Sequence, residues 1–253
     1  MQLTDTHTHL YYLEEAKDAV NRAINNGVTH LIMPCVDVQS IEPMQALAKS
    51  FPDNIRITKG LHPTEVNDDA EYLVKTIFEQ LEDDKQCIAV GEIGIDLYWD
   101  KTYRSKQMQI FDMQLQKAKS WELPVVIHCR EGLEETLEVL SAFPDLPCVF
   151  HCFGGSTSEA EHILSDYSNA YFGIGGVVTF KNNQLSDAVQ VIPVNRILLE
   201  TDSPYLAPVP YRGKQNESAY LPLIASTVAK IKNMDLEEFG NITSQNSVRL
   251  FGF

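Results

Sequence analysis

The sequence lacks a long hydrophobic run. No stretch of its 253 residues reaches the ~18 consecutive apolar residues that a membrane-spanning helix needs. The N-terminus also lacks the basic segment followed by an apolar segment that marks a secretory signal. We therefore expect a soluble, cytoplasmic protein with no membrane partner.

Positive charge is scarce. The chain has 20 Lys and Arg residues against 35 Asp and Glu residues, a formal net charge of −15. This balance argues against binding nucleic acid through a broad basic surface. A phosphate-bearing partner would need positive charge at one place, and bound metal ions are a common source of it.

Paired cysteine motifs and linkers are absent too. The five cysteines form an odd set without CxxC spacing, and four lie inside apolar segments, which predicts reduced thiols and no disulfides. No low-complexity segment or charge run marks a domain boundary. With 44% hydrophobic residues, residues 1–253 can form one domain with a large core.

Short apolar runs recur along the chain, separated by segments of helical periodicity. Continuous rather than alternating hydrophobicity favours parallel strands covered by helices. Eight such units in about 250 residues is the size of a (β/α)8 TIM barrel, and a doubly wound open sheet is the alternative. Two more helical segments follow, 221–232 and 236–251, and we expect the second to close the barrel. The eight runs begin at Leu3, Thr29, Ile55, Cys87, Leu123, Pro147, Ala170 and Arg196.

Polar residues cluster where these predicted strands end, which is where TIM barrels place catalytic groups. The opening "LTDTHTHL" carries His7 and His9 two positions apart. On a strand, this spacing turns both rings to one face, and two neutral imidazoles that converge favour a metal. Only His30 and His162 lie elsewhere among the seven histidines. The strand-end residues are His7, His9, His62, Glu92, His128, His151 and Asp202.

Six of these residues suit a centre with two metal ions. Four imidazoles and two carboxylates are costly to bury together unless a metal holds them, and a single catalytic zinc takes only about three protein ligands. We predict His7, His9 and Asp202 on one ion. His128 and His151 hold the other, and Glu92 bridges the two. Nitrogen and oxygen donors fit Mg, Mn, Zn, Ni or Fe. Cys129 and Cys152 alternate with their neighbouring histidines and are expected to point away from the barrel axis.

The motifs "DTHTHL", "GLHP", "GEIGID", "IHCR", "HCFGG" and "ETDSPYLAPVPYRGKQNE" occur in this order along nearly the whole chain. Together they resemble the TatD family of metal-dependent deoxyribonucleases, within the amidohydrolase superfamily. The resemblance implies a TIM-barrel hydrolase that cleaves DNA phosphodiester bonds, commonly as an exonuclease. It implies the same six metal ligands and makes His62 a phosphate or acid/base contact. The segments "GIDLYWD" and "NESAY" depart from the pattern beside ligands, which affects loop shape and substrate preference.

Roles in catalysis follow from this expectation. Two ions can activate a shared water and stabilise charge on the phosphoryl oxygens. We predict that Asp202 is the general base, because its carboxylate contacts both a metal and the water. His62 contacts the scissile phosphate or protonates the leaving oxygen; the alternative is a histidine that only bonds backbone in its turn. Glu200 shares a strand face with Asp202 and is expected to orient a metal ligand.

Substrate contacts are expected around the same barrel mouth. Arg130 follows His128 by two residues and would grip a phosphate, unless it pairs with Glu92 or Asp96. The long loop after Asp202 mixes cations with aromatic rings, which suits a nucleic-acid strand. Tyr98 and Trp99 would stack on bases or merely pack. The loop residues concerned are Tyr205, Tyr211, Arg212 and Lys214.

Two other functions remain open. An amidohydrolase acting on an ester or C–N bond, such as a lactonase, a cyclic-amide hydrolase or a deacylase of aminoacyl-tRNA, would use the same metal pair. Small-molecule members often carry a carboxylated lysine at the end of strand four, where this chain has Glu92. A catalytically inactive barrel used as a scaffold is the other alternative, but such copies normally lose ligands and here every expected position is filled.

Overall fold

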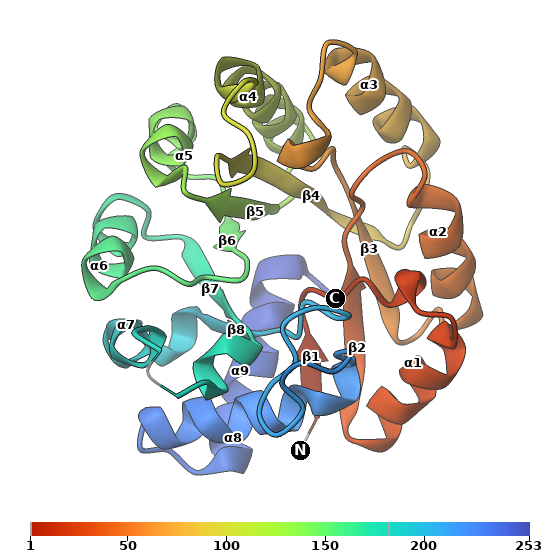
Figure 1. Ribbon diagram of the computed structural model, residues 1–253. Coiled ribbons are helices and arrows are strands. Elements are labelled where there is room, and N and C mark those ends of the chain that lie inside the picture. Colours follow the sequence, from red (N-terminus) through yellow and green to blue (C-terminus); the bar gives the residue numbers. More distant parts are fainter. Residues whose placement is uncertain (1, 182) are drawn as a thin grey trace.

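The computed structural model describes residues 2–181 and 183–253. Eight parallel strands run side by side in chain order, with helices outside them, and Figure 1 looks down the resulting barrel. This confirms the predicted (β/α)8 TIM barrel with additional C-terminal helices. The strands are β1 (Leu3–Asp5), β2 (Val28–Met33), β3 (Ile55–Lys59), β4 (Cys87–Asp96), β5 (Val125–Arg130), β6 (Cys148–Phe150), β7 (Ala170–Ile174) and β8 (Ile197–Leu199). The helices are α1 (Ala16–Asn25), α2 (Ile41–Ser50), α3 (Ala70–Gln80), α4 (Arg104–Ser120), α5 (Leu133–Leu140), α6 (Thr157–Asp166), α7 (Leu185–Val191), α8 (Leu221–Ile231) and α9 (Leu236–Phe251).

The first strand is shorter than the opening motif suggests. β1 ends at Asp5, so His7 and His9 follow the strand rather than lie on it. Backbone pairing nevertheless continues at Thr8, which forms a parallel bridge with Ser203: Thr8 N–H donates to Ile32 O (3.1 Å) and His9 N–H donates to Ser203 O (2.7 Å). The two histidines therefore keep the strand-like alternation that brings both rings to one side.

Asp5 links the last strand to the first. Its side chain is fully buried and accepts hydrogen bonds from Thr201 N–H (2.9 Å) and from the Thr201 hydroxyl (2.6 Å). Beside it, Thr6 N–H donates to Leu199 O (3.0 Å), which joins β1 to β8. Burial raises the pKa of Asp5 to about 7 despite these hydrogen bonds. Asp5 thus holds together the two segments that carry His7 and Asp202.

The barrel interior has its own apolar cluster, separate from the larger core between strands and helices. Inward-facing strand residues such as Val149 and Leu198 pack there against Leu250 and Phe251 of α9. The C-terminus accordingly lies near the middle of the ring of strands in the view of Figure 1. Helix α9 closes one end of the barrel.

The cysteines are free thiols, as predicted. Cys35 and Cys148 are buried, whereas the other three are half-buried. Cys129 Sγ accepts a hydrogen bond from Thr136 of α5 (3.5 Å), so this thiol points toward the helices. Within residues 2–181 and 183–253, the helices are all too short or too polar to cross a membrane.

Candidate metal centre

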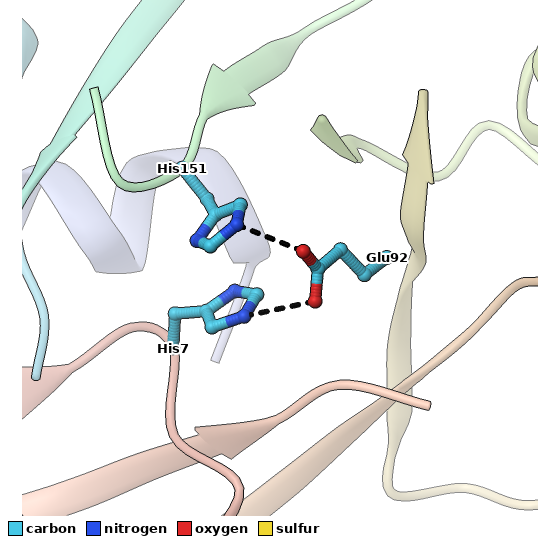
Figure 2. A group of neighbouring side chains, drawn as sticks. All are labelled: His7, Glu92 and His151. Carbon is cyan, nitrogen blue, oxygen red and sulfur yellow. Dashed lines mark ion pairs between the residues drawn. The ribbon is translucent and has the colours of Figure 1, made fainter. Parts of the chain in front are cut away.

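Glu92 of β4 stands at the centre of the strand-end cluster. Its Oε2 lies 3.1 Å from His7 Nε2 and 3.7 Å from His9 Nε2. Its Oε1 lies 2.8 Å from both His128 Nδ1 and His151 Nε2. Figure 2 shows the carboxylate between His7 and His151, with one oxygen turned to each. The two oxygens of one side chain therefore face different imidazoles.

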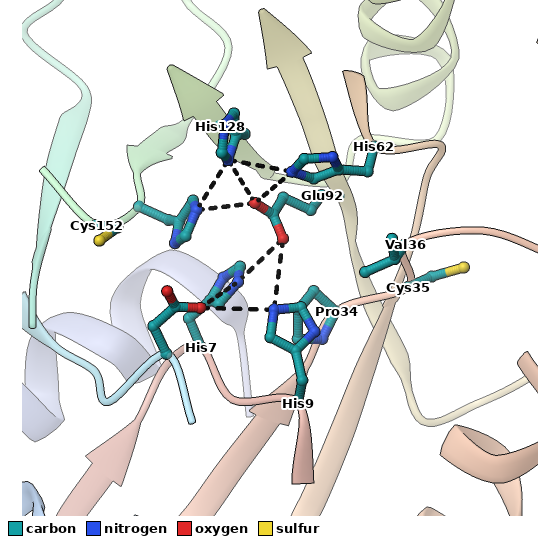
Figure 3. Close-up of polar contacts among 12 residues, drawn as sticks. His7, His9, Pro34, Cys35, Val36, His62, Glu92, His128 and Cys152 are labelled. Carbon is teal, nitrogen blue, oxygen red and sulfur yellow. Dashed lines mark hydrogen bonds and ion pairs between the residues drawn. The ribbon is translucent and has the colours of Figure 1, made fainter. Parts of the chain in front are cut away.

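Asp202 joins the Oε2 side. Its Oδ1 lies 3.9 Å from His7 Nε2 and 3.6 Å from His9 Nε2. The backbone of Asp202 is left-handed, with φ 55°, a conformation that Asp tolerates better than most residues. We call His7, His9, Asp202 and Glu92 Oε2 the first donor group, and His128, His151 and Glu92 Oε1 the second donor group. The structure thus brings together all six predicted ligands, and Figure 3 shows His7, His9 and His128 around Glu92. The division between two ions stays a prediction, because His7, Glu92 and His151 also lie close enough together to share one ion.

The donor set fits divalent metal ions. Within the described part of the chain, neither ring nitrogen of buried His7 has a hydrogen-bond partner, and His151 Nδ1 has none within hydrogen-bonding geometry. Buried polar atoms are rarely left this way, and an ion would satisfy His7 Nε2. Three-residue sets whose ligand atoms lie within 4.8 Å of one another include His7, His9 and Asp202, and His7, Glu92 and His151. Such imidazole and carboxylate donors suit Zn, Mn or Ni.

Burial and neighbouring charges shift the pKa values of the residues in this cluster. Burial alone would raise the pKa of Glu92, but the neighbouring His151, His7 and His62 hold it well below its usual value. Burial would lower the pKa of His151, yet the carboxylates of Glu92 and Glu200 raise it well above its usual value. Burial lowers the pKa of His7. The carboxylate is therefore ionised and poised to hold positive charge.

Outer hydrogen bonds select the nitrogen that two of the histidines turn to the centre, and a third histidine has a carboxylate behind it. His9 Nδ1 lies 2.9 Å from the Tyr11 hydroxyl, which itself donates to Pro34 O (2.6 Å) and so accepts from Nδ1–H. His128 Nε2 donates to Asp96 Oδ2 (2.9 Å). His151 Nδ1 lies 3.4 Å from Glu200 Oε1. In His9 and His128 the hydrogen bond turns the opposite nitrogen toward the centre, whereas Glu200 is only a charged neighbour of His151 Nδ1.

His62 is held differently. Its Nδ1 accepts a hydrogen bond from Thr64 N–H (3.2 Å) at the start of the short 3-10 helix Pro63–Glu65. The neutral ring therefore carries its proton on Nε2, which lies 3.3 Å from Glu92 Oε1. Burial lowers the pKa of His62, so the neutral form prevails at pH 7. The structure makes His62 a hydrogen-bond donor at the centre, although it also lies close enough to be grouped with Glu92 and His128.

Two residues of the centre were not among the predicted site residues. Asp96 bonds His128, and Tyr11 bonds His9. A signal for Asp96 was present, because Glu92, Gly94 and Asp96 are spaced by two along one strand and so share a face. Tyr11 follows His9 by two residues but belongs to a 3-10 turn, Leu10–Tyr12, that strand-like spacing does not predict.

The predicted substrate-contact residues make different contacts in the structure. The guanidinium of Arg130 lies 3.7 Å over the ring of Tyr98 and 5.4 Å from that of Trp99. Tyr98 and Trp99 are 48% and 71% exposed, so a large part of each ring faces solvent. Tyr205 is 55% exposed, and its ring contacts that of His9 edge to face, with ring centroids 6.3 Å apart. The guanidinium of Arg212 lies 4.4 Å from the centre of the Phe180 ring. Arg130 therefore stacks on aromatic rings, and the alternative of an ion pair with Glu92 or Asp96 is wrong for the residues described.

Comparisons with known proteins agree with this site. The family model "TatD related DNase" matches residues 4–252. The chain is 34% identical to the uncharacterized metal-dependent hydrolase YabD of Bacillus subtilis (strain 168), over 98% of each chain. It is 32% identical to the uncharacterized metal-dependent hydrolase YcfH of Escherichia coli (strain K12), over 99% of this chain and 96% of that one.

A solved structure points to the same family as the family model. The TatD homologue YjjV of Escherichia coli K12 matches with a TM-score of 0.91 at 26% identity, over 99% of this chain and 98% of that one. The family model spans the fold and every donor of the centre, from His7 to Asp202. The chain therefore belongs to the TatD family of metal-dependent hydrolases.

Proposed function

We propose that this hydrolase cleaves DNA phosphodiester bonds as an exonuclease, with two divalent ions in the two donor groups. The observation that supports this most is the division of the Glu92 carboxylate between the two groups. A pair of ions that shares one carboxylate supplies an activated water and stabilises both oxygens of an in-line displacement at phosphorus. DNA is the proposed partner.

The chain's own residues supply proton transfer. Asp202 is the proposed general base, because its carboxylate lies at the edge of the first donor group and stays ionised: burial would raise its pKa, but the nearby imidazoles of His9, His151 and His7 lower it. His62 presents Nε2–H toward the centre and is the proposed donor to a phosphate oxygen or to the leaving group. Glu92 holds the two donor groups together.

Binding of the strand falls to exposed cations and rings. Arg130, Tyr98 and Trp99, which we call the aromatic–arginine stack, offer a guanidinium for phosphate beside faces on which bases stack. Tyr205 presents a second exposed ring next to His9. Arg212 is the proposed contact for a more distant phosphate. These few local cations serve a chain whose net charge is −15.

One observation favours the deacylase alternative. A pocket of about 270 Å³ opens between the segment after β3 and the segment after β4, and Thr64 and Trp99 line it. Its lining includes the carboxylates of Glu65, Asp96 and Asp100. Such a pocket suits an amine better than a phosphate, as in an aminoacyl ester. The same metal pair would then activate water for a carbonyl carbon.

A substrate panel separates the two functions. The purified protein is incubated with single-stranded DNA, double-stranded DNA, RNA, a lactone set and aminoacyl-tRNA, each with Mg, Mn or Zn and with chelator. We expect nucleotide release from DNA that both chelator and Asp202→Asn abolish, whereas Asp100→Asn retains it. If no metal supports DNA cleavage while an ester or lactone turns over, the nuclease proposal fails.

A further inference from the structure

Asp96 contacts both the metal centre and the loop beside it. Its Oδ2 accepts the hydrogen bond from His128 Nε2 (2.9 Å). Its Oδ1 accepts from Tyr98 N–H (3.0 Å) and from Trp99 N–H (3.5 Å). The residue is only 2% exposed. One buried carboxylate thus connects a predicted ligand histidine with the backbone of the aromatic–arginine stack.

The position of Asp96 is itself held by α4. The side-chain amide of Gln107 brackets its backbone: Oε1 accepts from Asp96 N–H (2.9 Å) and Nε2 donates to Asp96 O (3.0 Å). Gln107 is buried. Both backbone groups of Asp96 are used in this way, so its main chain is fixed while its side chain can still respond to His128.

We propose that Asp96 is a positioning residue that couples the ion in the second donor group to the aromatic–arginine stack. Toward the ion, Asp96 holds the proton of His128 on Nε2 and turns Nδ1, 2.8 Å from Glu92 Oε1, to the centre. A carboxylate behind a ligand histidine fixes the ring and raises its basicity, and loss of such a partner typically costs 10–100-fold in metal affinity.

Toward the surface, Asp96 anchors the two rings. Tyr98 and Trp99 project from a short exposed segment, and the guanidinium of Arg130, itself exposed, lies over the Tyr98 ring. Arg130 lies directly opposite Asp96 in the β4–β5 pairing. When an ion fixes His128, the Asp96 carboxylate is fixed with it, and the backbone of Tyr98 and Trp99 is held in the orientation that presents the stack.

The two sides of the centre differ in this respect. His151 has a carboxylate neighbour in Glu200, but Glu200 Oε1 accepts a hydrogen bond from Cys152 N–H, on the buried side. His9 has the neutral hydroxyl of Tyr11. Of the two carboxylates behind these histidines, Asp96 is the one whose hydrogen bonds reach an exposed aromatic segment.

Trp99 provides a direct readout that needs no substrate. The chain has two tryptophans, so Trp121→Phe leaves Trp99 as the only indole. In this background, Zn²⁺ is titrated into metal-free protein against a chromogenic chelator while Trp99 emission is followed. Variants His9→Ala and His128→Ala assign the binding phases to the first and second donor groups. Asp100→Asn is the matched control, because this exposed carboxylate lies in the same loop and bonds only Thr102.

We expect the Trp99 emission to change in the phase that His128→Ala removes. In Asp96→Asn, that phase should weaken by 10–100-fold, and the emission change should be lost even at saturating Zn²⁺. Asp100→Asn should behave as the parent does. The proposal is overturned if Asp96→Asn binds both ions with parental affinity, or if its Trp99 emission still responds fully at saturation.

A second measurement uses the unaltered chain and so does not depend on a variant that folds. In the Zn²⁺-loaded protein with ¹⁵N-labelled histidine, we expect His128 to carry a proton on Nε2 and the ion on Nδ1. Coordination through Nε2 would overturn the proposal. The designation of the stack as a substrate surface rests on the proposed nuclease function, but neither measurement uses DNA. A nuclease assay that fails while these two succeed leaves the coupling intact.

Discussion

Glu200 lies directly against Gly173, and this contact sets the space behind His151. A Cβ added at Gly173 would overlap Glu200 Oε2. The carboxylate that faces His151 Nδ1 at 3.4 Å therefore depends on the absence of a side chain on β7. We expect Gly173→Ala to displace Glu200 and to weaken the second-group ion by about 10-fold.

Metal titration by calorimetry measures this effect. Gly154→Ala is the control, because an added Cβ there meets only Cys152 O at 3.8 Å. Equal metal affinity in Gly173→Ala and Gly154→Ala would show that Glu200 does not support His151.

The Tyr11 hydroxyl bridges His9 and the backbone. Tyr11→Phe leaves the buried Pro34 carbonyl and His9 Nδ1 without this partner. We expect a loss of about 1–3 kcal/mol in the free energy of unfolding, together with weaker binding of the first-group ion. Denaturant unfolding and metal titration measure the two effects, and Tyr72→Phe, at an exposed position, serves as control. A variant as stable as Tyr72→Phe would contradict the bridging role.

Asp5 predicts a specific pH dependence of stability. Its pKa is about 7 in the folded chain, against the ordinary value of 3.8 for an aspartic acid. Because the folded state favours the protonated form, this residue's contribution to stability is full below pH 4 and is lost as the pH rises through about 7. The difference between the two values corresponds to about 4 kcal/mol.

A comparison of the metal-free wild type with Asp5→Asn isolates the contribution of Asp5 ionisation to the free energy of unfolding. We expect the stability of the wild type relative to the variant to fall between pH 4 and pH 8, as measured by denaturant unfolding at each pH. A difference that stays constant, or that grows with pH, would refute the buried acid as its source.

Arg130 is expected to bind DNA by both charge and stacking. With a non-cleavable phosphorothioate strand, Arg130→Ala should weaken binding by about 10-fold, a loss that one charge-assisted phosphate contact explains. Arg130→Lys keeps the charge but loses the flat contact with Tyr98, and it should recover only part of the affinity. Fluorescence anisotropy at several salt concentrations measures this. Wild-type binding by Arg130→Ala would exclude the stack from the DNA surface.

The barrel could be predicted from the recurring apolar runs, and the six donors could be predicted from the residue types at the strand ends. His7 and His9 share a side even though β1 ends at Asp5, since the alternation persists through hydrogen bonds to Ile32 and Ser203. Contacts between distant segments could not be predicted in this way. Asp5 meets Thr201, which is 196 positions away, only because the barrel closes.

The state of His62 also required the structure. The sequence allowed a phosphate contact, a proton donor to the leaving oxygen, or a histidine that only bonds backbone in its turn. The hydrogen bond from Thr64 N–H to Nδ1 places the proton on Nε2 and favours a donor. A backbone contact of this kind depends on the φ and ψ of a 3-10 turn, which hydrophobic periodicity does not encode.

The most direct test of the account is the location of the metal. In crystals of the Zn²⁺-loaded protein, anomalous difference maps at the zinc edge should show two peaks about 3.5–4 Å apart, one beside each oxygen of Glu92. The first should contact His7, His9 and Asp202, and the second His128 and His151, with His62 bound to neither. A single peak at full loading, or a peak ligated by His62, would contradict the shared two-ion centre described above.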